Sequence, residues 1–156
     1  MRIYCKSAFH QIDVAVTSII KMMERLTDSD LESRPTRGKH SIGELLEHIA
    51  IICEADILIS NEATQDEMNA YYANVHLKNL DEIKSAIRQN QQRLQDKYQS
   101  YSEEEILQKT TSYWGVTYTR FEWLLEIVAH LYHHRGQLHA MLVHCLKNDP
   151  KVALFE

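Results

Sequence analysis

The residues of this chain with the clearest capacity for chemistry are histidines close to its C-terminal end. Nine histidines occur in 156 residues, and three of them fall in the segment His130-Leu-Tyr-His133-His134-Arg135-Gly136-Gln137. Four residues advance an α-helix by about 40° beyond one full turn, so His130 and His134 project from one face, a turn apart. Two imidazoles at this spacing can hold one metal ion. The pair is incomplete as a metal site, and a further ligand must come from elsewhere in the chain.

His48 is the candidate for the third ligand. It lies within Glu44-Leu-Leu-Glu-His48-Ile-Ala-Ile-Ile, where a histidine among core-type residues needs a polar partner or a place at the edge of the apolar stripe. If the helices that carry His48 and His130 are neighbours, three imidazoles converge. Three neutral nitrogen donors leave a coordination position open, as in catalytic metal sites, and they suit Zn, Ni, Fe or Cu.

Simpler interpretations of the same histidines stay open at this point. A lone His48 is more often an ordinary half-buried histidine, and a pair four residues apart also arises by chance in a histidine-rich helix. The zinc-protease pattern HExxH is disfavoured, because Leu131 stands where the general-base glutamate is needed. The remaining histidines have no partner at a telling spacing and are expected at the surface or at an edge: His10, His40, His76, His139 and His144.

Three residues near these histidines have structural interpretations. Glu44 can orient His48 or cap its own helix together with Ser41, and the cap is the favoured role. Arg135 faces about 140° away from His130, which favours a structural ion pair over a role at the metal. Gly136 inside a helix costs about 1 kcal/mol relative to alanine, which fits either close packing of another helix or of a second copy, or a long helix stable enough to absorb the cost.

Composition limits the classes of protein that fit. A chain of 18.3 kDa with 44% hydrophobic residues predicts a single domain over residues 1–156, and 4 Gly and 2 Pro are too few for a β-sandwich or barrel. Charges interrupt every apolar stretch and no secretory signal is visible, so we expect no membrane span and a cytoplasmic protein. A net charge of −5 without a basic cluster argues against nucleic acid as a partner. Cys5, Cys53 and Cys145 form no metal or disulfide pattern, and Cys53 is expected in the core.

Apolar residues spaced three or four apart predict four long helices. The expected ranges are Ser7–Leu26, Ser41–Ser60, Leu80–Tyr98 and Thr119–Lys147, with capping boxes at Ser41–Glu44 and Thr119–Glu122 and a possible short helix at Gln65–Tyr72. The third helix has a narrow apolar stripe and is expected to dock by one face. The four helices predict an all-α four-helix bundle, and the long connection between the third and fourth helices is a candidate for one crossover.

The segment Ile106–Thr117 is rich in β-branched and aromatic residues and fits either a short hairpin or an ordered loop. The pair Tyr113-Trp114 within it is a candidate pocket wall. At the C-terminal end, Val152–Phe155 is an apolar tail that can dock on its own bundle or on a partner.

Two segments together resemble the DinB/YfiT-like superfamily. They are Ser41-Ile-Gly-Glu-Leu-Leu-Glu-His48-Ile and His130-Leu-Tyr-His133-His134-Arg135-Gly136-Gln137-Leu138, and chain length and helix order also match. The resemblance implies a four-helix bundle with a long crossover, usually a homodimer, that binds a divalent metal such as Zn or Ni. The ligand positions of the family carry over to His48, His130 and His134. His133, Arg135 and Gln137 match the motif without an assigned role as ligands.

The resemblance also implies two functions. Some relatives are S-transferases that join a low-molecular-weight thiol such as bacillithiol to an electrophile, which predicts a small-molecule substrate and a thiol co-substrate. Many others have no known activity, and the alternative is a non-catalytic module that holds a metal or a small molecule. Neither the general base nor any other catalytic residue can be assigned from the sequence.

Overall fold

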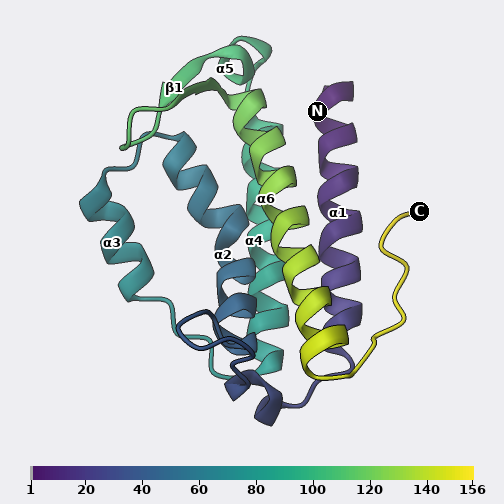
Figure 1. Cartoon of the computed structure of the whole chain (residues 1–156). Coiled ribbons are helices and arrows are strands. Elements are labelled where there is room, and N and C mark those ends of the chain that lie inside the picture. The colour runs from purple at the N-terminus through teal and green to yellow at the C-terminus, as the bar shows by residue number, and fades with distance from the viewer. Residues whose placement is uncertain (1) are drawn as a thin grey trace.

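The computed structural model describes residues 2–156 and shows four long helices side by side (Figure 1). These helices are α1 (Ile3–Met23), α2 (Ile42–Ser60), α4 (Leu80–Ser100) and α6 (Arg120–Ala140). Shorter elements connect them: the 3₁₀ turn η1 (Asp28–Glu32), α3 (Gln65–Ala73), α5 (Glu103–Leu107), β1 (Lys109–Thr111) and β2 (Thr117–Thr119). The predicted all-α four-helix bundle is confirmed, with one small hairpin added.

The four helices pack in a ring. α2 packs against α4 and α6, and α1 packs against α6 and α4. Figure 1 shows α1 and α6 running in one direction and α2 and α4 in the other. Two observations fix the ends of α4: the backbone N–H of Leu80 donates to Asp28 beside the end of α1, and the Tyr98 hydroxyl donates to the carbonyl of Arg120 at the start of α6.

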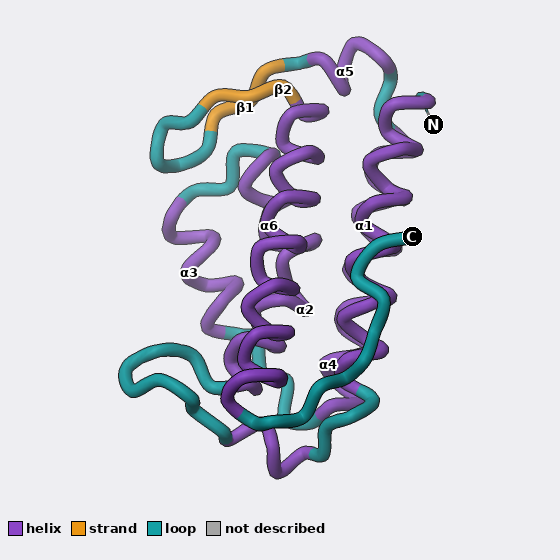
Figure 2. The backbone as a smooth tube through the Cα atoms, turned by 45° about the vertical axis from the view of Figure 1, so that its right-hand side comes forward, coloured by secondary structure: helices purple, strands orange, loops and turns teal. Residues whose placement is uncertain are grey.

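The crossover lies at a different place from the one expected. α2 and α4 are parallel neighbours, so the chain must travel the length of the bundle between them, and residues 61–79 with α3 do this on the outside (Figure 2). The connection between α4 and α6 instead stays at one end. Sequence patterns give the length of a connection but not the direction of the helices that it joins, which packing decides.

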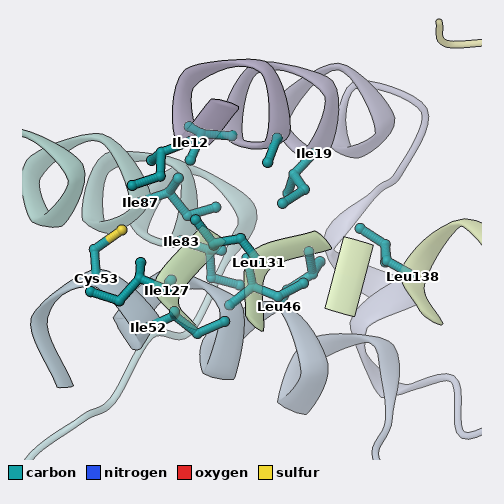
Figure 3. Packing of buried hydrophobic residues seen from close by; sticks show 14 of the residues in the cluster. Ile12, Ile19, Leu46, Ile52, Cys53, Ile83, Ile87, Ile127, Leu131 and Leu138 are labelled. Atoms are coloured by element: carbon teal, nitrogen blue, oxygen red, sulfur yellow. The ribbon is translucent and has the colours of Figure 1, made fainter. Parts of the chain in front are cut away.

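The core of the bundle is aliphatic and comes from all four helices (Figure 3). Ile12, Ile52, Ile83 and Leu131 represent one helix each, and their exposed fractions are 1% or less. Cys53 is buried in this core, as its apolar sequence context predicted. α4 follows its prediction as well: its buried residues form one stripe, and its other faces are exposed. Burial of apolar surface contributes about 25 cal/mol per Å² and is the main source of the stability of this helix packing.

At the two ends of the bundle, the end of α6 differs from expectation, whereas the hairpin confirms one of the two alternatives for Ile106–Thr117. α6 gives way at Met141 to a π-helical turn, Met141–Cys145, and Lys147 has a positive φ of 54° instead of continuing the helix. The segment Ile106–Thr117 contains the end of α5, β1 and the hairpin turn, with β1 antiparallel to β2 and Thr110 opposite Tyr118. Gly115 lies in that turn with φ of 95°, a conformation that glycine adopts without strain.

The C-terminal tail docks on its own bundle. Val152 and Leu154 pack against the core, and the Phe155 ring lies 6.2 Å from that of Tyr132. Arg135 anchors the tail: it is buried, and its Nη1 donates to the Leu154 carbonyl at 2.6 Å and to Ser18 Oγ at 3.2 Å. The predicted ion pair of Arg135 is therefore wrong, because its partners are neutral oxygens and aromatic rings.

Gly136 does not serve close packing inside the chain. A Cβ atom built on it meets nothing within 4 Å, so no other helix of the described chain approaches there. Gly43, in the first turn of α2, is the helical glycine that close packing requires, since a Cβ there would lie 2.9 Å from the Leu31 carbonyl oxygen. Contact of Gly136 with a second copy stays a prediction. Among residues 2–156, no helix combines the length and apolar character needed to cross a bilayer.

Candidate metal centre

His48 is set on α2 by a well-capped helix start. Ser41 Oγ accepts from the Glu44 N–H at 3.1 Å, and Glu44 accepts from the Ser41 N–H at 2.8 Å, which is the predicted capping box. The Glu44 carboxylate also takes two hydrogen bonds from Arg34, at 2.7 and 2.8 Å. These hydrogen bonds, from Arg34 first and then from Ser41, lower the pKa of Glu44 to about 2. Glu44 therefore caps the helix and pairs with Arg34 and does not orient His48.

At the start of α6, one of the two hydrogen bonds of a capping box is present. Thr119 accepts from the Glu122 N–H at 3.1 Å, whereas the reciprocal bond of the predicted capping box is absent among the described residues. Trp123, one residue further on, fastens this end to the hairpin, because its indole N–H donates to Thr110 Oγ1 at 3.0 Å. α6 is thus held at its start by the hairpin and along its length by α1 and α2.

Antiparallel packing of α2 against α6 brings the three candidate histidines together. Nε2 of His48 lies 3.2 Å from Nε2 of His130 and 3.0 Å from Nε2 of His134. All three ligand atoms lie within 4.8 Å of one another, and all three residues are half-buried. A tetrahedral ion with metal–nitrogen distances of about 2.0–2.1 Å separates its ligands by about 3.3–3.4 Å. The group therefore has the chemistry and nearly the spacing of a three-histidine metal site.

The hydrogen bonds made by the Nδ1 atoms of these histidines favour a cation between the three Nε2 atoms. His130 Nδ1 lies 2.8 Å from Asp56 Oδ2, and His134 Nδ1 lies 2.7 Å from Gln137 Oε1. Both partners accept hydrogen bonds, so Nδ1 of each imidazole carries a proton and its Nε2 presents a lone pair when the ring is neutral. His48 Nε2 can donate to one of them at most. A metal ion satisfies all three nitrogens at once, and hydrogen-bonded imidazoles of this kind are usual around metals.

Electrostatics differ among the three rings. Burial, reinforced by the neighbouring imidazoles of His134 and His130, lowers the pKa of His48 to about 4. Burial also lowers the pKa of His134, although Gln137 opposes this shift. At His130 burial acts in the same direction, but the hydrogen bond and negative charge of Asp56 outweigh it and raise the pKa. The lowered pKa values of His48 and His134 favour their neutral forms with free lone pairs, whereas the raised pKa of His130 favours the proton that competes with a metal there.

Asp56 is the residue of the candidate site that the sequence analysis did not identify. Its carboxylate comes from α2, two turns after His48, and its side chain is only 18% exposed. The available signal was a single acidic residue in the apolar run Ala55-Asp56-Ile57-Leu58-Ile59, where a carboxylate needs a partner. Gln137 was noted as part of the motif, and the structure gives it a contact: it holds the His134 ring.

The other histidines stay outside the group. His133 is exposed, and its ring contacts that of His134 at 4.8 Å between centroids. His40 stacks over His48 at 6.5 Å, a contact between a loop and α2 that no helical spacing predicts. His10 lies at the tail, where its Nε2 is 2.9 Å from a Glu156 carboxylate oxygen.

Two cavities adjoin the histidine group on different sides. One, of about 670 Å³, reaches His48 and is lined by the loop that carries Arg34, Lys39 and His40. The other, of about 290 Å³, reaches His130 and Asp56 and is lined by Tyr113 and Trp114. The hairpin turn therefore forms a pocket wall, as its aromatic content predicted. Small molecules have space to approach the centre from both sides.

Fold and site define a class of protein: a four-helix bundle with one crossover and a three-histidine group compatible with a metal ion between antiparallel helices. The sequence profile of the DinB superfamily matches residues 11–138. The chain belongs to the DinB superfamily, which confirms the resemblance found in the sequence.

Solved structures agree with this membership. A putative member of the DinB family from Exiguobacterium sibiricum 255-15 is 33% identical, with 99% of each chain covered and a TM-score of 0.87. A DinB-like protein from Bacillus cereus ATCC 10987 is 18% identical over 88% of this chain and 89% of its own, with a TM-score of 0.70. A DinB-like protein from Bacillus subtilis is 15% identical over 85% and 86%, with a TM-score of 0.64. These last two share the fold. The comparison with curated proteins produced no match.

Proposed function

We propose that this protein binds a divalent metal, Zn or Ni, through His48, His130 and His134 and acts as a metal-dependent thiol S-transferase. The reaction joins a low-molecular-weight thiol of the bacillithiol type to an electrophile. The observation that carries the proposal is the convergence of three Nε2 atoms within 4.8 Å of one another. A three-histidine set leaves room for an exogenous ligand, which distinguishes catalytic from closed structural sites.

The residues have separate tasks in this proposal. His48, His130 and His134 hold the metal, while Asp56 and Gln137 fix the ring orientation of His130 and His134. A bound divalent cation supplies Lewis acidity that lowers the pKa of a thiol. In the reaction a thiol R–SH and an electrophile R′–X give R–S–R′ and HX: the S–H and R′–X bonds break, the S–R′ bond forms, and the proton leaves with X.

The protein's own buried cysteines do not supply the nucleophile. Burial raises the pKa of Cys53 to about 12 and also raises that of Cys5. Both side chains are closed off in the core, so no substrate reaches them. Cys145 is exposed but lines a different cavity, beside Gln137 and Met141. A thiol that enters from solvent is therefore the nucleophile that the site accommodates, and the Cys145→Ser variant is expected to keep full activity.

The test combines metal content with turnover. Protein purified without a His tag is expected to contain about one metal per chain by elemental analysis and to conjugate bacillithiol to monochlorobimane in a metal-dependent reaction. His134→Ala removes the metal and the activity, whereas His133→Ala, which alters the neighbouring exposed ring, keeps both. No metal-dependent rate with any cellular thiol would leave only the alternative, a module that holds a metal or a small molecule. That alternative still predicts a lower melting temperature after chelation.

We also propose that the protein is a homodimer. The open surface at Gly136 supports this, since helix backbones of two copies can approach closely where no Cβ stands between them. Light scattering measures the mass in solution directly.

A further inference from the structure

The cavity beside His130 has a chemical character that the proposed reaction does not explain. Four aromatic residues line it: Tyr72 from the crossover helix α3, Tyr113 and Trp114 from the hairpin turn, and Trp123 from α6. The two segments that the chain adds to the four long helices thus contribute three of these rings. They meet here although more than 40 residues separate Tyr72 from Tyr113 in the sequence.

Tyr113, Trp114 and Trp123 pack edge-on, and all of the four aromatic side chains except the buried Trp123 remain accessible. Trp114 and Trp123 have perpendicular planes with centroids 6.4 Å apart, and Tyr113 is edge-on to Trp114 at 4.7 Å. Tyr72, Tyr113 and Trp114 are 40%, 43% and 50% exposed. This aromatic surface does not pack into the main hydrophobic core of the bundle. Large aromatic side chains that stay exposed around a cavity indicate a ligand-binding site more often than a requirement of core packing.

Apart from the imidazole of His130, the titratable groups at the wall of the cavity that can carry charge near neutral pH are acidic. Asp56 and Glu126 line it, and none of its lining residues among those described is a lysine or an arginine. Asp56 pairs with His130, whereas no ion pair of Glu126 is found in residues 2–156. Burial and the nearby negative charge of Asp56 raise the pKa of Glu126, although His130 opposes this shift, so the surroundings of this carboxylate disfavour its ionised form. A positive charge in the cavity would stabilise the ionised carboxylate.

We propose that this cavity binds a small ligand that carries an ammonium group. Aromatic faces attract a cation through their quadrupoles, Trp most strongly, and a carboxylate adds a direct charge interaction. An anionic ligand would meet two carboxylates, and a neutral apolar ligand would gain nothing from Glu126.

The proposal goes beyond the metal chemistry and does not depend on it. The rings of Tyr113 and Trp114 and the carboxylate of Glu126 are outside the three-histidine group. Absence of a metal or of thiol transfer therefore leaves the ammonium site intact, and the two proposals can fail separately.

The indole N–H signals of the two tryptophans in the chain can report ligand binding in this cavity. Choline and its neutral isostere 3,3-dimethylbutan-1-ol are titrated into the full-length ¹⁵N-labelled protein, as purified, at constant ionic strength. The two indole N–H signals are followed by NMR and assigned with Trp114→Phe. Choline is expected to shift the Trp114 signal in a saturable way, and the isostere is expected to bind at least about tenfold more weakly.

Variants separate the charge from the rings. Glu126→Gln is expected to reduce the preference for choline to less than about threefold, whereas Glu24→Gln, an equal charge change at the far end of α1, leaves it unchanged. Trp114→Ala weakens binding of both compounds, and its circular dichroism and melting curve verify the fold. Equal affinity for choline and its isostere, no saturable shift, or an unchanged preference in Glu126→Gln would each overturn the proposal.

Discussion

His130 donates a hydrogen bond from Nδ1 to Asp56 Oδ2 at 2.8 Å, and this bond connects α6 to α2 across the candidate metal centre. It fixes the tautomer that turns the Nε2 lone pair of His130 toward His48. The negative charge of Asp56 also strengthens His130 as an electron-pair donor. One carboxylate therefore both connects two helices and orients a candidate metal ligand.

Removal of that charge is expected to weaken metal binding. Asp56→Asn keeps the size of the side chain and loses the charge, so we expect the affinity for zinc to fall by about 10- to 100-fold. Competition with a chromophoric chelator measures this. Asp66→Asn, in the first turn of α3 and outside the centre, is the matched control and should bind like the unmodified chain. Equal affinities for the two variants would show that Asp56 does not support the metal.

Acid is expected to release the metal, beginning at His130. Because Asp56 raises the pKa of His130 above the ordinary value, a proton competes with the metal there first as the pH falls. Because the pKa of His130 is raised, the loss of affinity should begin above the ordinary imidazole pKa of about 6.5 and approach about tenfold per pH unit below it. His48, with a pKa of about 4, contributes a further loss only at lower pH.

Zinc titrations between about pH 5 and pH 8 measure this dependence. Asp56→Asn removes the cause of the raised pKa of His130, so its affinity should begin to fall at a lower pH. An affinity that stays constant down to about pH 5 would contradict binding through imidazole nitrogens.

The two helical glycines are expected to respond to alanine in opposite ways. At Gly43 a Cβ would lie 2.9 Å from the Leu31 carbonyl oxygen and 3.1 Å from its Cβ, so Gly43→Ala should lower the free energy of unfolding by about 1–3 kcal/mol. At Gly136 the space is open, so Gly136→Ala should raise it by about 0.5–1 kcal/mol through the higher helix propensity of alanine.

Urea denaturation gives both free energies, and light scattering on the same samples reports the oligomeric state. If a second copy packs on Gly136, Gly136→Ala instead weakens the dimer. A monomer that Gly136→Ala stabilises would argue against that interface.

Loss of the Arg135 side chain is expected to release the C-terminal tail. Arg135→Ala removes the hydrogen bond to the Leu154 carbonyl and the cation–π contacts with Tyr132 and Phe155, which should cost about 2 kcal/mol of stability. Trypsin should then cleave after Lys151 at least several-fold faster than in the unmodified chain. Arg88→Ala, which alters an exposed arginine on α4, is the control and should leave the cleavage rate unchanged.

The sequence alone determined the helices and the histidine pair because both depend on local periodicity. The spacing of His130 and His134 places them on one face of any helix, and the apolar stripes define four helices that must bury one another. Local rules also predicted the cap at Ser41 and Glu44, since that contact spans only three residues. The prediction of His48 as the third member of the group rested on its polar character in a core-like segment and on the family pattern.

Tertiary structure alone decided how the helices meet. The direction of α4, and with it the position of the crossover, depends on which helices pack side by side. The contact of Asp56 with His130 joins residues 74 apart in sequence, and the aromatic cavity combines α3, the hairpin turn and α6. Such contacts arise from the packing of whole elements, which the order of residues within one element does not specify.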